Sequence, residues 1–147
     1  MDLSPYYRQI DKLTERIHRL RRDIDKLDDI RYQMQREQQE RHQIIERMSA
    51  SAARFESIPH VKSAKALFDG FRSGMDANLR PHLDENYTKI NQQLIRDIFQ
   101  REDEIMELRK RIARLEEQIA EERELERRRV EREREERERE AAAARRG

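Results

Sequence analysis

The sequence contains no cysteine and no tryptophan, and it has only three glycines and three prolines among its 147 residues. Without cysteine, the chain can form neither a disulfide scaffold nor a thiolate metal site, and it has no catalytic thiol. Apolar residues make up only 35% of the chain, and no apolar run approaches the length that crosses a bilayer. The sequence therefore predicts a protein without a thick globular core that does not insert into a membrane.

The first ten residues lack the basic start and the apolar run of a cleaved signal peptide. We therefore expect a cytoplasmic protein, or one that is secreted together with a partner. Charged residues make up 44% of the chain, yet the net charge is only +1 because the two signs are interleaved. Dedicated nucleic-acid binding needs a clustered basic face, so nucleic acid is not the partner that this pattern favours.

No motif in the sequence points to catalysis. The four histidines are scattered without the spacing of metal ligands: His18, His42, His60 and His82. Phosphate-binding glycine loops and a nucleophile elbow are absent, and no pocket is indicated that would tune the many carboxylates for acid–base work. We expect no metal, no cofactor and no enzymatic activity.

The N-terminal half predicts one long helix over about residues 5–55, starting at the cap residue Ser4 and Pro5. Its apolar residues follow a spacing of three and four, with β-branched residues at one position and leucine at the other, as in a two-stranded coiled coil. The positions that continue this spacing form a polar window from about residue 31 to residue 41. We expect Arg31 or Arg41 to pair there with Asp84 or Glu85 of the opposite helix.

Proline, glycine and serine gather after this helix and predict a bend at about residues 56–62. A second helix is expected over about residues 63–120, with a kink at residues 80–81 because of Pro81. The stripe of apolar residues at spacings of three and four, which we call the seam, is lost from residue 121 to residue 147. A Glu/Arg-rich solvated helical tail is predicted there. The fold class is therefore all-α: a long antiparallel helical hairpin, or coiled coil, with an extended charged C-terminal helix.

A bend near residue 60 sets the expected contacts between the two arms. Leu13 should lie near Leu108, Ile24 near Ile98, and Met48 near Phe71 or Met75, with the arms matched to about residue 115. Several large apolar residues fall outside the seam and would leave a lone hairpin with exposed apolar surface: Tyr7, Ile30, Tyr32, Ile44, Phe68 and Phe99. We therefore expect a homo- or hetero-oligomeric bundle.

The order of these features resembles a known family over roughly residues 5–120. The carrying segments are the tyrosine-led helix at residues 6–27, the motif at residues 64–72, the step from Tyr87 to Ile90, and the coiled coil at residues 105–119. They resemble the YwqH-like helical-hairpin companions of LXG toxins in type VII secretion loci, which are related to the WXG hairpins. The family's tryptophan-X-glycine motif is absent, and residues 60–63 stand in its place.

The resemblance implies a chaperone or targeting adaptor that packs against the helical N-terminal region of an LXG toxin for export. The residues expected to bind the partner are the seam and two phenylalanines: Ile10, Leu13, Ile17, Leu20, Ile24, Phe68, Phe71, Leu94, Ile98, Ile105 and Leu108. For the seam residues and for the two phenylalanines, an intramolecular core is the competing interpretation. The competing function is a self-assembling structural coiled-coil scaffold.

Overall fold

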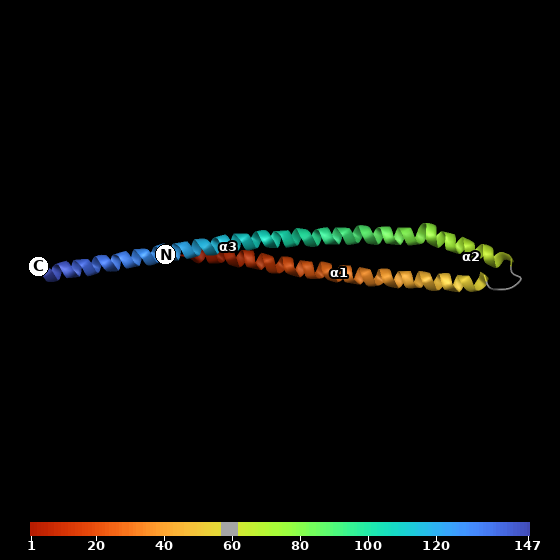
Figure 1. Cartoon of the computed structure of the whole chain (residues 1–147), viewed down its shortest axis with the longest axis horizontal. Helices are drawn as coiled ribbons and strands as arrows, with labels where there is room; N and C mark the ends of the chain where they lie inside the picture. The colour runs from red at the N-terminus through yellow and green to blue at the C-terminus, as the bar shows by residue number, and fades with distance from the viewer. Residues whose placement is uncertain (57–61) are drawn as a thin grey trace. The chain divides into compact units, whose positions relative to one another are not determined.

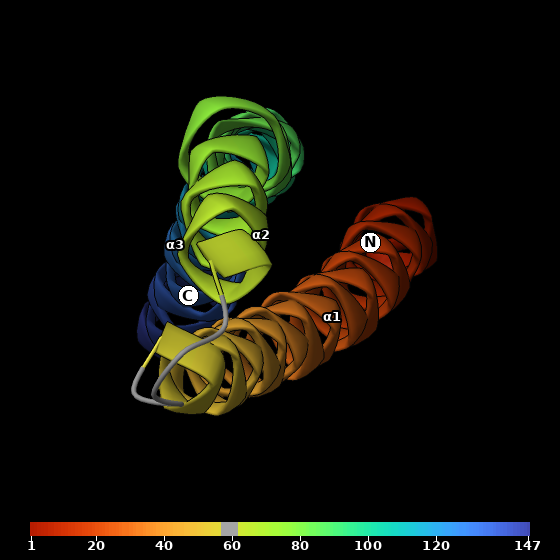
Figure 2. The same ribbon diagram turned by 90° about the vertical axis from the view of Figure 1, so that its right-hand side faces the viewer.

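A computed structural model of the chain describes residues 1–56 and 62–147, and all its regular structure is helical (Figure 1). Helix α1 spans Ser4–Glu56, α2 spans Lys62–Gly74, a π-helical turn η1 spans Met75–Leu79, and α3 spans Arg80–Arg146. The view along the helices in Figure 2 likewise shows no strand in the described ribbon. Residues 57–61 of the predicted bend lie outside the described residues.

The chain divides into two compact units, and in each of them a segment of α1 pairs with an antiparallel segment of α3. The terminal unit comprises Met1–Arg21 and Glu102–Gly147, and the bend unit comprises Arg22–Arg101. The all-α helical hairpin is therefore confirmed. None of the described helices is apolar over a stretch long enough to cross a membrane.

The core of the terminal unit is one layer of apolar side chains between its two helical segments. Five residues are buried there: Ile17, Leu20, Ile105, Leu108 and Ile119. Arg16 and Glu104 form an interhelical ion pair at the edge, with Nε and Oε1 3.1 Å apart. Closer to the start of α1, the Tyr6 hydroxyl donates to Glu122 Oε1 at 2.7 Å.

The expected overlap of the arms, to about residue 115, was too short, because the N-terminal turn of α1 contacts Glu122 and Arg123. Leu13 lines a groove together with Leu115, and Arg16 pairs with Glu104 close to the register that placed Leu13 near Leu108. The predicted tail does begin soon afterwards, since every residue from 127 to 147 is exposed.

The core of the bend unit contains Ile45, Met75 and Ile98, which are buried. Arg31 Nε donates to Asn91 Oδ1 across the unit at 3.2 Å. Arg101 Nε lies 3.8 Å from Asp23 Oδ2. These contacts place the middle of α1 beside the first third of α3.

The irregular turn of the second arm lies at Met75–Leu79 and not at the predicted residues 80–81, since α3 runs without a break from Arg80 through Pro81. Proline lacks an N–H group, and its ring clashes with the carbonyl four residues earlier, which here belongs to Ala77. The backbone therefore widens one turn before the proline, and the Arg80 N–H donates to the Met75 carbonyl, five residues back.

The start of α1 is capped by a residue other than the predicted Ser4. The Asp2 carboxylate accepts a hydrogen bond from the Ser4 N–H at 2.9 Å, and the Leu3 carbonyl accepts bonds from the N–H groups of Tyr6 and Tyr7. The bonds from Ser4 lower the pKa of the Asp2 carboxyl. A carboxylate at this end also complements the helix dipole.

Candidate interaction surface

An exposed apolar surface of the bend unit lies where α1 approaches α2. Two shallow hollows adjoin there and share Ala52 and Phe71 in their linings. We call this area the bend-end surface and define it by six residues: Ile44, Met48, Ala52, Leu67, Phe68 and Phe71. Ile44 is 53% exposed, Met48 46% and Leu67 71%, so large apolar side chains face solvent on both helices.

Helical spacing explains why these residues share one surface. Ile44, Met48 and Ala52 follow one another at intervals of four on α1, and Leu67 and Phe71 do the same on α2. The neighbouring Ile45 is 4% exposed and turns into the core, so two consecutive isoleucines serve different faces. The bend-end surface is therefore additional to the stripe that holds the two arms together.

The structure separates the predicted partner-binding residues into two groups. The seam residues pack between the arms, either buried or half-buried: Ile10, Leu13, Ile17, Leu20, Ile24, Leu94, Ile98, Ile105 and Leu108. Phe68 and Phe71 are half-buried and belong to the bend-end surface. Another chain can reach these phenylalanines without separating the arms, and their role in partner binding stays a prediction.

Sequence reasoning missed part of this surface. Met48 was expected near Phe71, and the two line one hollow, but Met48 was assigned to the seam and not to an exposed surface. Leu67 was assigned to nothing. The signal for Leu67 was its distance of four residues from Phe71, which places both on one side of a helix. Ile44 had been recognised as lying outside the seam.

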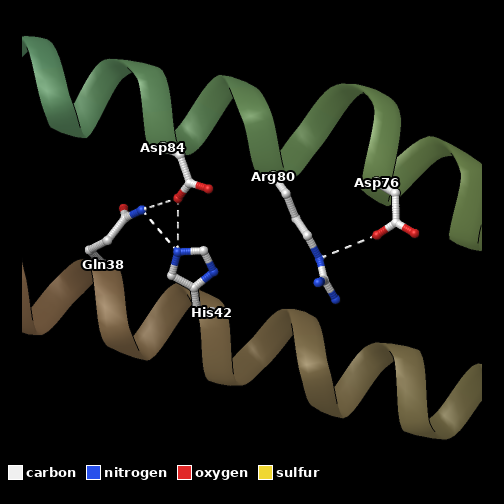
Figure 3. Close-up of polar contacts among 5 residues, drawn as sticks. All are labelled: Gln38, His42, Asp76, Arg80 and Asp84. Atoms are coloured by element: carbon white, nitrogen blue, oxygen red, sulfur yellow. Dashed lines mark hydrogen bonds and ion pairs between the residues drawn. The ribbon is translucent and has the colours of Figure 1, made fainter.

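A polar cluster joins α1 to α3 in the middle of the bend unit (Figure 3). Gln38 Nε2 donates to Asp84 Oδ1 at 2.9 Å, and His42 Nε2 lies 3.0 Å from the same oxygen. His42 donates to Asp84 when it carries a proton on Nε2. Its side chain is 39% exposed, so this contact contributes little stability, and its main effect is to fix the register of the arms.

The predicted partners of Asp84 were wrong, although its position opposite the polar part of α1 was right. Arg31 lies seven residues before Gln38 and meets Asn91, seven residues after Asp84. Glu85 is rotated by about 100° from Asp84 around the helix, and it pairs with Lys89 on its own helix at 2.9 Å. This pairing lowers the pKa of the Glu85 carboxyl.

Asp76 forms a second polar group beside the irregular turn. Arg80 Nε lies 3.6 Å from Asp76 Oδ1 (Figure 3). Arg72 Nε lies 3.8 Å from Asp76 Oδ2. Asp76 is thus flanked by cations one turn before and one turn after it. These ion pairs bridge the turn Met75–Leu79 on its polar side.

No set of histidine and carboxylate side chains within residues 1–56 and 62–147 is arranged to hold a metal ion. The pronounced features of the described residues are thus a hairpin core, a polar register cluster and an exposed apolar surface. Comparison with known protein families, curated proteins and solved structures gives no match to the chain.

Proposed function

We propose that the chain is a non-enzymatic helical adaptor that binds helices of a partner protein through the bend-end surface. The resemblance of the sequence to YwqH-like hairpins supports the helical N-terminal region of an LXG toxin as the partner and targeting for export as the purpose. The observation that carries the proposal is the surface itself, where apolar side chains of α1 and α2 adjoin and remain exposed.

The energetics favour a helical partner. Full burial of a large aliphatic side chain contributes roughly 1.5 to 3 kcal/mol, so covering the exposed half of Ile44, Met48 or Leu67 contributes about 1 kcal/mol each. An amphipathic helix can lay its apolar stripe into the hollow between two helices, as in helix-in-groove recognition and helical bundles. The two arms form their core without this surface, so it is available for such a contact.

Self-assembly as a structural scaffold is the second candidate. It is favoured by two exposed apolar residues on α3 outside the bend-end surface, because Ile90 is 50% and Phe99 is 59% exposed. Association of several copies would cover these side chains together with the bend-end surface. The two candidates differ in stoichiometry, since an adaptor exchanges self-association for its partner and a scaffold keeps it.

Co-expression with the product of the neighbouring gene, which the proposal expects to be the toxin, followed by light scattering on the purified material, tests the proposal. We expect a one-to-one complex that replaces any homo-oligomer. The exposed-site variant Leu67→Asp and the double variant Phe68→Asp/Phe71→Asp should lose it. The matched control Leu125→Asp/Val130→Asp alters two exposed apolar residues of the terminal unit and should retain it.

Circular dichroism of each variant shows whether its helices are intact. A stable homo-oligomer that ignores the toxin region would contradict the adaptor and support the scaffold. A complex that survives Leu67→Asp and the double phenylalanine variant would exclude the bend-end surface as its binding site.

A further inference from the structure

An open groove between α1 and α3 in the terminal unit is lined by positively charged side chains and by no negatively charged ones. Leu13 and Leu115 are its apolar lining residues, and the others are polar or basic: Gln9, Lys12, Arg111, Arg114 and Gln118. No carboxylate is among them. In a chain with 33 basic and 32 acidic residues, such a local excess of cations is set by the pairing of the helices and not by composition.

The three cations of this groove are unpaired. The side chains of Lys12, Arg111 and Arg114 make no ion pair and no hydrogen bond within residues 1–56 and 62–147. Two nearby cations do have partners, since Arg16 bonds to Glu104 across the helices and Lys110 bonds to Glu107 on its own helix. Carboxylates are thus available in the same unit, and these three side chains do not use them.

We propose that this basic groove binds an acidic amphipathic helix of a partner protein. Apolar side chains of that helix would lie on Leu13 and Leu115, and its carboxylates would bond to Lys12, Arg111 and Arg114. This inference rests on the proposed function, to which it adds a second contact and the charge of the bound helix. It is tested with synthetic helices, so it can fail while the adaptor stands.

A helix fits the groove better than the other anionic ligands. A third helix packed over two is the ordinary arrangement of helical bundles, and it supplies apolar and acidic groups on adjoining faces. A nucleic-acid strand would be held mainly through its phosphates, and it offers no aliphatic side chains to the two leucines. The groove is open to solvent, which does not favour enclosure of a small molecule.

The test uses two fluorescent peptides of equal length, with leucines at helical spacing flanked by glutamates in one and by lysines in the other. Anisotropy titrations with the full-length chain measure affinity, and amide NMR shifts locate the site. We expect the acidic peptide to bind about tenfold more tightly than the basic one at low salt, with shifts centred on Leu13 and Leu115. The preference should weaken as salt rises.

Charge reversal supplies the decisive variants. Lys12→Glu/Arg111→Glu/Arg114→Glu should reverse the preference between the two peptides, and substitution of the same three residues by glutamine should abolish it. All three side chains are exposed, so these variants should fold. The matched control reverses three exposed cations of the tail, and it should bind like the wild type: Arg132, Arg137 and Arg139.

Equal binding of the two peptides, or an unchanged preference after reversal of the groove, would overturn the proposal. So would a single-stranded oligonucleotide that binds the groove more tightly than the acidic peptide, because it would identify a phosphate site. Loss of the acidic-peptide preference only in the tail variant would also overturn it. None of these results would remove a toxin complex formed through the bend-end surface.

Discussion

Truncation of Leu20 to alanine should remove a large share of the stability of the hairpin. Leu20 is 1% exposed and is the most completely buried large side chain among the described residues. Buried Leu→Ala substitutions cost about 2.7 to 5 kcal/mol, and the thin core of two helices can partly collapse around the gap, so we expect about 3 kcal/mol. Leucine and alanine both favour helix, so the change in propensity adds little.

Urea unfolding followed by far-ultraviolet circular dichroism measures this change. For a denaturant dependence of about 2 kcal/mol per molar urea, the midpoint should fall by about 1.5 M. Leu67→Ala is the matched control, because that side chain is 71% exposed, and its midpoint should shift by less than about 0.3 M. Both proteins are compared at one concentration, since association would also stabilise them. Equal shifts for the two variants would refute the placement of Leu20 in the core.

Three further perturbations test single contacts. The hydrogen bond from Tyr6 to Glu122 raises the pKa of the Tyr6 phenol. The stability that this hydrogen bond contributes is therefore complete below about pH 10 and is lost as pH rises through the higher pKa of the folded state. In thermal unfolding, Tyr6→Phe should lose less stability at alkaline pH than the wild type. Asp84→Ala should lower the free energy of unfolding by less than about 1 kcal/mol, because its contacts are half exposed; a loss of several kcal/mol in urea unfolding would contradict this. Pro81→Ala should raise that free energy by about 1 to 3 kcal/mol and restore α-helical carbon-13 shifts in the preceding turn; a less stable variant would contradict our account of that turn.

The sequence was sufficient to predict the helices, because their signals are local. The first helix was expected at about residues 5–55, and it spans Ser4–Glu56. Spacings of three and four residues identified the stripe that includes Ile17, Leu20 and Ile98, all of which are buried. These signals need no knowledge of what the helix packs against.

The pairing of the arms was only partly predictable. The seam is compatible with more than one length of overlap, which is why the arms were matched only to about residue 115, although Tyr6 reaches Glu122. The contacts of His42 with Asp84 depend on the rotation of both helices about their axes. The sequence identified His42 only as a histidine without metal-ligand spacing. The irregular turn was expected at Pro81 itself, whereas the steric conflict of proline lies one turn earlier.

The interaction surfaces were the least accessible to sequence reasoning. Leu67 and Phe71 share a face of α2, but their continuity with Ala52 on α1 appears only when the two helices are placed together. The unpaired state of Lys12 and Arg111 is likewise a property of the folded unit, since each has acidic residues within a few positions in the sequence. The LXG-toxin partner remains a proposal that stands on the resemblance and on the exposed surface.

The hairpin forms within one chain that folds back on itself. Isotope-coded cross-linking of the double variant Arg16→Cys/Glu104→Cys tests this most directly. The native chain has no cysteine, so the two introduced thiols are unique. The replaced side chains bond across the helices at 3.1 Å, and a short bismaleimide can bridge the two positions. The control pair Arg16→Cys/Arg132→Cys moves the second thiol along α3 by about 42 Å and should not cross-link within a chain.

Unlabelled and nitrogen-15-labelled chains are unfolded, mixed, refolded together and cross-linked before digestion and mass spectrometry. A hairpin within one chain predicts linked peptides in which both halves are unlabelled or both are labelled. Mixed peptides amounting to about half of the linked product would show that the helices pair between different chains. That result would contradict the hairpin and leave a multi-chain coiled coil.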